Sequence, residues 1–285
     1  MKILLTGSNG QLGHDFKKIF NKKNIEYIAT DYKELDITSD KDLNKFFQEN
    51  EEITHIINCA AYNDVDKAET DKKVWLLNVE APKKLAEFSK KIGAIFVTYT
   101  TDFVFDGEKN SPYVEGDKTN GISEYGKSKA QGEKEVLKAN DRSFVIRTSW
   151  LFGIGGNNFN KQVINWSKSR NELNIVDDQV SVPTYSMDLA EFSWKLIQTE
   201  KFGLYHITND GIASKYDQAK YVLEKIGWKG TLGRAKTVDF NLPAKRPAYS
   251  KLDSSKVEKL LGEKIPTWQS GIDRFLEEMK ENGEL

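Results

Sequence analysis

The sequence has very few of the features that mark several large classes of protein. It has one cysteine, Cys59, in 285 residues, so no internal disulfide can form, and we expect a reducing, cytoplasmic setting. No apolar run approaches the ~20 residues that a membrane-spanning helix needs, so we expect no membrane association. The apolar stretch Ile3–Leu5 leads directly into glycine-rich polar sequence, which is not typical of a signal peptide.

An excess of charge of either sign is also lacking. The 42 basic residues nearly balance the 43 acidic ones, for a net charge of −1, which argues against a nucleic-acid partner but leaves room for a local phosphate site. No cluster of histidines, cysteines and acids has the spacing of metal ligands, so no metal-binding residues are predicted. The length fits one large or two moderate domains.

A strand, a glycine-rich turn and a helix are predicted at the start of the chain. Residues 2–6 are apolar enough for a buried strand, and the turn Gly7-Ser-Asn-Gly10-Gln-Leu-Gly13 follows with GxxGxxG spacing. Small residues let the backbone approach a pyrophosphate, and the N-terminus of the following helix offers free N–H groups. A glycine turn without a ligand is the simpler alternative.

An acid follows the second predicted strand at the position expected for a ribose ligand. Strand Glu26–Thr30 ends at Asp31, which lies 18 residues after Gly13, close to the spacing of about 20 in dinucleotide-binding proteins. A carboxylate there favours a free 2′-hydroxyl, and therefore NADH over NADPH, although Lys33 nearby could weaken that preference.

The next two strands are predicted to end beside the same ligand. Residues 55–62 form an apolar strand that ends in small residues, and a helical region at 75–93 contains Asn78, which either holds a backbone carbonyl or water near the site or is merely tolerated. Strand 94–100 is followed by Thr101, whose hydroxyl could bond a substrate carbonyl or simply cap the strand. Cys59 is interpreted as a packing residue.

Tyr125 and Lys129 are four residues apart, so on a helix they lie on one face. An ammonium beside a phenol stabilises the phenolate and lowers the tyrosine pKa. A tyrosine tuned in this way exchanges a proton with a carbonyl near neutral pH. Alone the spacing is weak, and a solvated helix face explains it as well.

The second half loses the regular alternation of strand and helix. After strand 143–147, short strands at 173–176 and 203–207 alternate with helices, as in a smaller substrate domain, and helix 188–198 is expected to return to the main sheet. We therefore predict an α/β protein: a Rossmann-like doubly wound parallel sheet in residues 1–150, with a returning segment near 177–200, interleaved with a smaller α/β substrate-binding domain in residues 151–285.

Arg246 in the proline-flanked loop 243–247 suits a diphosphate, or is only solvated.

Together these features resemble the extended short-chain dehydrogenases/reductases, and within them the dTDP-4-dehydrorhamnose reductase family. The resemblance spans nearly the whole chain. It rests on Gly7-Ser-Asn-Gly-Gln-Leu-Gly13, Asp36-Ile-Thr38, Asn58-Cys-Ala-Ala-Tyr62, Val65-Asp-Lys-Ala-Glu69, Thr101-Asp-Phe-Val-Phe-Asp-Gly107, Tyr125-Gly-Lys-Ser-Lys129, Arg147-Thr-Ser-Trp150 and Arg246-Pro-Ala-Tyr-Ser250.

The resemblance implies a role for each matching residue. Thr101, Tyr125 and Lys129 would be catalytic. Substrate contacts would come from Thr101, Asp102, Trp150 and Arg246. Cofactor contacts would come from Gly7, Asn9, Gly10, Gln11, Leu12, Asp31, Asp36, Ile37, Ala60, Ala61, Tyr62, Asn78, Tyr99, Tyr125 and Lys129. Two positions depart from the family pattern: Phe103, usually tyrosine, which we expect to keep a packing role, and Ser181, usually glycine, which puts the shape of that loop in doubt.

The implied reaction is NAD(P)H-dependent reduction of the C4 keto group of dTDP-4-dehydro-L-rhamnose. Alternatives are a reductase or epimerase of another nucleotide sugar, a dehydratase, and a non-catalytic dinucleotide-binding regulatory subunit. Phe103 stands where dehydratases carry the second acid of an Asp-Glu pair, and the intact Thr101, Tyr125 and Lys129 disfavour a regulatory subunit. Some family members dimerise around Mg²⁺, so monomer and homodimer, with or without Mg²⁺, both remain open.

Overall fold

The structure, a computed structural model, describes all 285 residues. Its centre is a six-stranded sheet in which every pair of neighbours is parallel, in the order β10-β5-β4-β3-β1-β2. The strands are β1 (Lys2–Thr6), β2 (Glu26–Thr30), β3 (His55–Asn58), β4 (Ile95–Thr101), β5 (Ser143–Thr148) and β10 (Gly203–His206). The doubly wound parallel sheet predicted from the sequence is confirmed.

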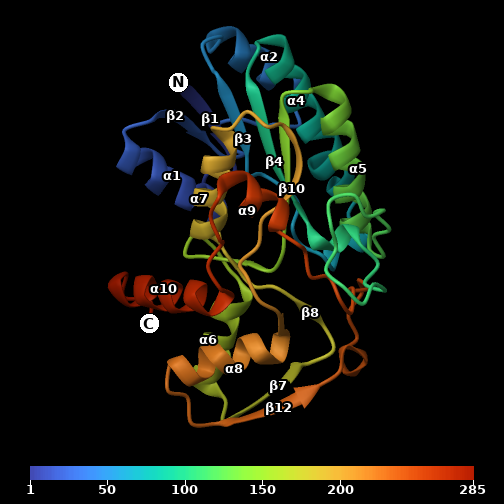
Figure 1. Cartoon of the computed structure of the whole chain (residues 1–285), viewed down its shortest axis with the longest axis vertical. Coiled ribbons are helices and arrows are strands. Elements are labelled where there is room, and N and C mark those ends of the chain that lie inside the picture. The colour runs from blue at the N-terminus through green and yellow to red at the C-terminus, as the bar shows by residue number, and fades with distance from the viewer.

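Helices cover both faces of this sheet because its strands are apolar on both sides. On one face, Ile3 and Leu5 pack in a core with α1 (Gln11–Lys23) and α7 (Ser186–Ile197). Leu4 points to the other face, where α2 (Asp40–Glu49), α4 (Ala81–Lys91) and α5 (Glu124–Ala139) cover it. Figure 1 shows α1 and α7 on one side of the sheet and α4 and α5 on the other. The expected return of helix 188–198 to the sheet is confirmed by α7.

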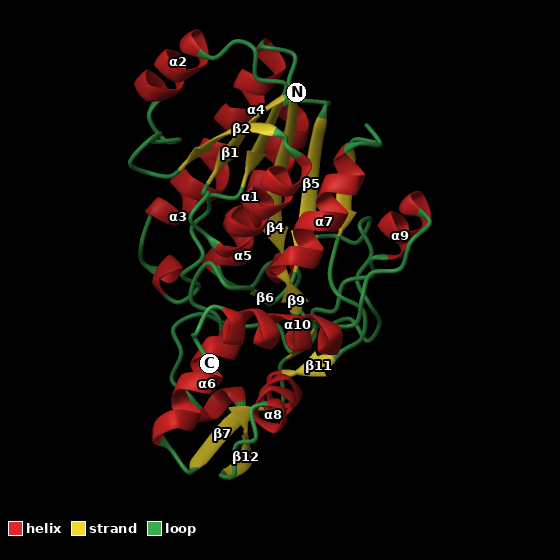
Figure 2. Cartoon of the chain, turned by 90° about the vertical axis from the view of Figure 1, so that its left-hand side faces the viewer, coloured by secondary structure: helices red, strands yellow, loops and turns green.

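A second apolar core of 17 buried residues lies below the sheet. It is built mainly on α6 (Phe159–Ser169), α8 (Lys215–Lys225) and α10 (Trp268–Glu281) with the parallel pair β7 (Glu172–Val176) and β12 (Thr231–Ala235). Two short pairs complete this part, β6 (Leu151–Phe152) with β9 (Thr184–Tyr185) and β8 (Val180–Ser181) with β11 (Ala213–Ser214), and α9 (Ser255–Leu261) lies beside β10. Figure 2 shows α6, α8, β7 and β12 below the sheet.

The structure corrects three local predictions. Strand 203–207 was expected in the smaller domain, but β10 pairs with β5 and extends the main sheet. The third strand ends at Asn58, and residues 59–62 are not strand. The predicted helix at 75–93 is α3 (Lys73–Trp75), a π-helical turn (Leu76–Glu80) and α4. The division into domains at residue 150 stays a prediction.

None of the helices is both long and apolar enough to cross a membrane. Short 3₁₀ turns occur at Lys67–Glu69, Asp102–Val104 and Thr237–Asp239. The first two of these, η1 and η3, lie in the loops that follow β3 and β4, and so at the carboxyl edge of the sheet.

Candidate active site

Two adjoining hollows lie along the carboxyl ends of β1, β3 and β4. Their volumes are about 560 Å³ and about 370 Å³, and both are lined by Gly7, Gly10, Cys59, Ala60, Ala61 and Asn63. From β1 the chain adds β2 on one side, and it then returns to add β3 on the other side of β1. The edge of the sheet beside β1 and β3 is therefore its topological switch point. Open α/β sheets bind their ligands there. The hollows together form one groove, which we call the cleft.

The glycine turn forms the floor of the cleft through very close backbone contacts. Gly7 has φ +66°, and a Cβ there would lie 2.5 Å from the backbone N of Ala60. A Cβ at Gly13 would lie 2.5 Å from the carbonyl O of Gly7. Only glycine allows this approach of β1, β3 and α1. Gly10 is the N-cap of α1 and no side chain caps the helix, so its N-terminal N–H groups are available to an anion.

The far end of the cleft carries the predicted adenosine residues. Asp31 follows β2 and its carboxylate accepts hydrogen bonds from the N–H groups of Asn9, at 3.2 Å, and Tyr32, at 2.8 Å. Asp36 accepts from the Thr38 N–H at 2.9 Å, and both Asp36 and Ile37 line the cleft. The structure therefore brings Asp31, Asp36 and Ile37 together at one end, and their contacts with a cofactor stay predictions.

Asn78 lies in the π-helical turn and fixes the backbone beside the cleft. Its side-chain oxygen accepts from the Tyr62 N–H at 2.9 Å, and its amide donates to the Tyr62 carbonyl and the Ser128 hydroxyl, each at 3.1 Å. π-Turns are common at functional sites. Of the two alternatives left open by the sequence, the structure favours the one in which Asn78 holds a backbone carbonyl.

Tyr125 reaches the end of β4 because α5 packs very closely there. Ser123 caps α5 by accepting from the Gly126 N–H at 3.1 Å. A Cβ on Gly126 would lie 2.1 Å from the Phe103 carbonyl O, so glycine is needed at the second position of the Tyr-Gly-Lys-Ser-Lys motif. The Phe103 ring meets the Tyr125 ring edge-on, with centroids 5.9 Å apart. The packing role expected for Phe103 is confirmed.

Burial dominates the electrostatics of Tyr125. It raises the pKa of the phenol, an interaction with the Thr101 hydroxyl lowers that pKa, and the Asp102 charge raises it. The phenol also donates a long hydrogen bond of 3.5 Å to Asn63 Oδ1. Thr101 and Tyr125 therefore lie together, a geometry that the sequence left open, and Tyr125 keeps its proton at neutral pH.

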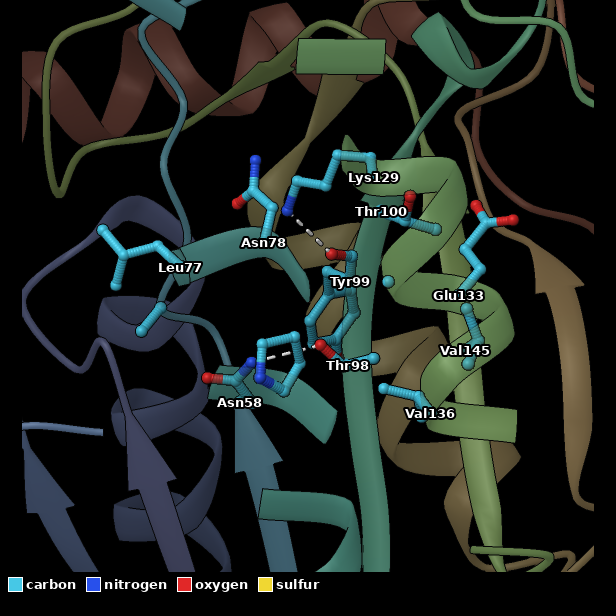
Figure 3. Close-up of a pocket in the computed structure, with 13 residues that line it drawn as sticks. Asn58, Leu77, Asn78, Thr98, Tyr99, Thr100, Lys129, Glu133, Val136 and Val145 are labelled. Carbon is cyan, nitrogen blue, oxygen red and sulfur yellow. Dashed lines mark hydrogen bonds between the residues drawn. The ribbon is translucent and has the colours of Figure 1, made fainter. Parts of the chain in front are cut away.

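Lys129 lies one turn further along α5 and lines the cleft. Its ammonium donates to the Tyr99 carbonyl O at 3.2 Å, a bond that Figure 3 draws within a small buried pocket. Burial lowers the pKa of Lys129 to about 8, against the effect of the Glu133 charge. The structure differs here from the expectation that Lys129 lowers the Tyr125 pKa, because the ammonium is bonded to Tyr99 and burial governs both groups.

Asp102 is buried beside Thr101 and is surrounded by hydroxyl groups. It accepts from Thr101 at 3.0 Å, from Ser181 at 3.0 Å and from Ser250. Burial raises its pKa, and the three hydroxyls and the Lys215 charge lower it. Ser181, the departure from the family pattern, is thus one of the donors that hold Asp102. Since Thr101 has one hydroxyl proton, it cannot bond Asp102 and a substrate oxygen at the same time.

Trp150 has a backbone conformation that bulky residues rarely adopt. Its φ is +44°, in the left-handed region, at the turn between β5 and β6, and its side chain lines the cleft with Thr101 and Asp102. Strained residues of this kind cluster at ligand sites. The ammonium of Lys215, a residue that the sequence motifs did not single out, lies 3.6 Å from the Trp150 ring centroid.

Arg246, from the C-terminal half of the chain, forms an ion pair with Asp66 from the N-terminal half. Its guanidinium donates to the two Asp66 carboxylate oxygens at 3.1 and 2.8 Å, and the Ala244 N–H donates to Asp66 at 3.2 Å. The hydrogen bonds from Arg246 lower the pKa of Asp66, against the effect of burial. Arg246, the predicted diphosphate ligand, is therefore paired with the carboxylate of Asp66, the residue after Val65 in the cleft lining.

Two further predictions concern Cys59 and metal ligands. Burial raises the pKa of the Cys59 thiol far above its usual range, which agrees with a packing role. No group of three or more His, Cys, Asp or Glu side chains is arranged to hold a metal ion.

Comparisons with known proteins agree over nearly the full length. The sequence matches the RmlD substrate binding domain family over residues 1–281. It is 36% identical over 288 aligned positions to dTDP-4-dehydrorhamnose reductase of Aggregatibacter actinomycetemcomitans, covering 95% of this chain and 97% of that one.

Two solved structures are similar in the same way. A dTDP-4-dehydrorhamnose reductase from Clostridium acetobutylicum superposes with a TM-score of 0.95 at 40% identity, covering 98% of this chain and 100% of that one. The Bacillus anthracis enzyme of that name, solved in complex with NADP, gives 0.93 at 35% identity, covering 97% and 99%. A sequence match of this extent, on a shared fold, shows that the chain belongs to the RmlD substrate binding domain family.

Proposed function

We propose that this protein reduces the C4 keto group of dTDP-4-dehydro-L-rhamnose to dTDP-L-rhamnose with a nicotinamide dinucleotide. Relatives with that name match it over nearly the whole chain. The observation that carries the proposal is the position of Tyr125, packed beside Thr101 at the carboxyl end of β4, in a cleft that begins at an uncapped helix N-terminus.

The residues of the cleft suit a dinucleotide. The glycine turn suits the pyrophosphate, because it has no side chains at Gly7 and Gly13 and leaves the N-terminal N–H groups of α1 free. Asp31 at the end of β2 favours a ribose with a free 2′-hydroxyl, so we propose NADH as the better cofactor, although the relative from Bacillus anthracis was solved with NADP. When bound, the reduced nicotinamide supplies the hydride.

The side chains of this chain supply the proton and the orientation. Tyr125, protonated at neutral pH, donates its proton to the C4 oxygen as negative charge develops there. Lys129 holds the nicotinamide ribose. Thr101 polarises the carbonyl once a sugar hydroxyl takes its place as a donor to Asp102. Trp150 packs against the sugar and Arg246 binds the diphosphate.

The test is steady-state oxidation of NADH and of NADPH, followed at 340 nm, with dTDP-4-dehydro-L-rhamnose as substrate. We expect turnover of the wild-type protein with both cofactors and a higher kcat/KM with NADH. Tyr125→Phe keeps the ring against Phe103 and removes the proton, so kcat should fall by ~10²-fold or more. A Tyr125→Phe variant with near-normal kcat would contradict the assignment of the proton donor, and a wild-type protein without turnover would contradict the reaction.

A further inference from the structure

Lys215 is a cation with no carboxylate partner, located beside the substrate end of the cleft. It is the first residue of α8, and its ammonium lies 3.6 Å from the ring centroid of Trp150 and 4.6 Å from that of Phe159. Its hydrogen bond is a long one of 3.4 Å to the neutral side chain of Gln218. Two aromatic faces attract a cation, but they do not replace the water that burial removes.

The charged groups around Lys215 compensate that cation only in part. Burial lowers its pKa to about 7. The Asp102 charge opposes that effect and the Arg246 charge adds to it. Asp102 already accepts three hydroxyl bonds, and Arg246 is paired with Asp66. The place of Lys215 in the first turn of α8 also disfavours its charge, because the positive end of the helix dipole lies there.

We propose that Lys215 binds the sugar-proximal phosphate of the nucleotide-sugar substrate. This inference rests on the proposed function. The Lys215 ammonium lies against the ring of Trp150, which lines the reacting end of the cleft with Asp102. The charge of Arg246, the predicted diphosphate ligand, also reaches it, so this is where we place the junction of the sugar and its diphosphate. A phosphate there would complete the bonding of Lys215 and benefit from the α8 dipole. The Trp150 ring would keep the ammonium in place while the sugar packs beside it.

Isothermal titration of the full-length protein with dTDP and with thymidine tests the proposal. Lys215→Met should weaken dTDP binding about ten-fold, the worth of one charge-assisted hydrogen bond, and leave thymidine binding unchanged, because thymidine has no phosphate. Lys220→Met is the matched control: Lys220 lies on the same helix, is half exposed and pairs only with Glu224, at 3.8 Å. It should bind dTDP as the wild type does.

Proton uptake gives a second readout that a merely structural role would not change. Bound phosphate holds Lys215 protonated, so above about pH 7 the wild type should take up protons on binding dTDP, and its affinity should fall as pH rises. Lys215→Arg keeps the charge at every pH, so it should retain dTDP affinity and lose that part of the proton uptake.

Two results would overturn the inference. If Lys215→Met binds dTDP as tightly as the wild type, with the same proton uptake, Lys215 does not contact phosphate, and the proposed reaction is unaffected. If the wild type binds no dTDP at all, the proposed function and this inference fail together. Lys215→Arg keeps the test decisive even if the methionine variant does not fold.

Discussion

At the residue scale, the site is made of ionisable groups that burial moves away from their usual behaviour. Burial raises the pKa of Tyr125 and lowers the pKa of Lys129 to about 8. The first effect keeps a proton on the group proposed to donate it. The second means that the Lys129 charge is present at neutral pH but is lost in mild alkali.

Lys129→Met should separate function from stability. In the folded protein Lys129 releases its proton above about pH 8, whereas the unfolded chain holds it up to about 10.5. Between these values the unfolded state binds more protons, so this group makes the wild type more stable as pH rises. Methionine has no proton to release.

Thermal unfolding of both proteins at about pH 7 and about pH 10 checks this. The Tm of the variant minus that of the wild type should fall as pH rises, and reductase activity should be low at both values. A Tm difference that stays constant with pH would mean that Lys129 is not deprotonated early in the folded state. The wild-type kcat/KM should also decline above about pH 8.

At the element scale, the position of α5 decides whether Tyr125 reaches the end of β4. Gly126 is the contact point, because a Cβ there would lie 2.1 Å from the Phe103 carbonyl O. Alanine is a better helix former than glycine by about 1 kcal/mol, so helix propensity alone would favour the substitution.

Gly126→Ala should nevertheless destabilise the protein, by about 1–3 kcal/mol, and should reduce kcat because α5 must move away from Thr101. Urea unfolding and the NADH assay measure the two effects. Gly116→Ala is the control, since Gly116 is exposed and an added Cβ would meet no atom within 4 Å. An active Gly126→Ala variant of normal stability would show that α5 does not need this close contact.

The elements also show where sequence patterns suffice. The strand-turn-helix at the start follows from apolar periodicity and glycine spacing, which are local properties. The strand at β10 was predicted, but its place in the main sheet was not, because a four-residue strand carries no signal that tells which sheet it will join. The π-turn at Leu76–Glu80 did not follow either, because the bonds between Asn78 and Tyr62 bring together residues 16 apart.

At the scale of the whole molecule, the ion pair of Asp66 with Arg246 links the two halves of the chain beside the cleft. If Arg246 binds the substrate diphosphate, Asp66 competes for it. Asp66→Asn keeps an oxygen for the Ala244 N–H and removes the charge, so dTDP affinity should rise several-fold while the Tm falls slightly.

Titration calorimetry with dTDP and thermal unfolding measure both effects. Asp64→Asn is the control, because Asp64 lies in the same segment but pairs with Lys67, at 3.1 Å. Unchanged or weaker dTDP binding by Asp66→Asn would mean that the carboxylate positions Arg246 instead of competing with the ligand.

The sequence by itself determined the parallel sheet from β1 to β5 and the glycine turn, because strand and helix periods and short motifs depend on neighbouring residues. Its resemblance to the reductase family implied Thr101, Tyr125 and Lys129 as the candidate catalytic set. Only the tertiary structure decided how these groups are partnered: Lys129 with the Tyr99 carbonyl, Arg246 with Asp66, and Lys215 with Trp150. Such partners are far apart in the chain, and their pKa values depend on burial, which exists only once the two halves have packed together.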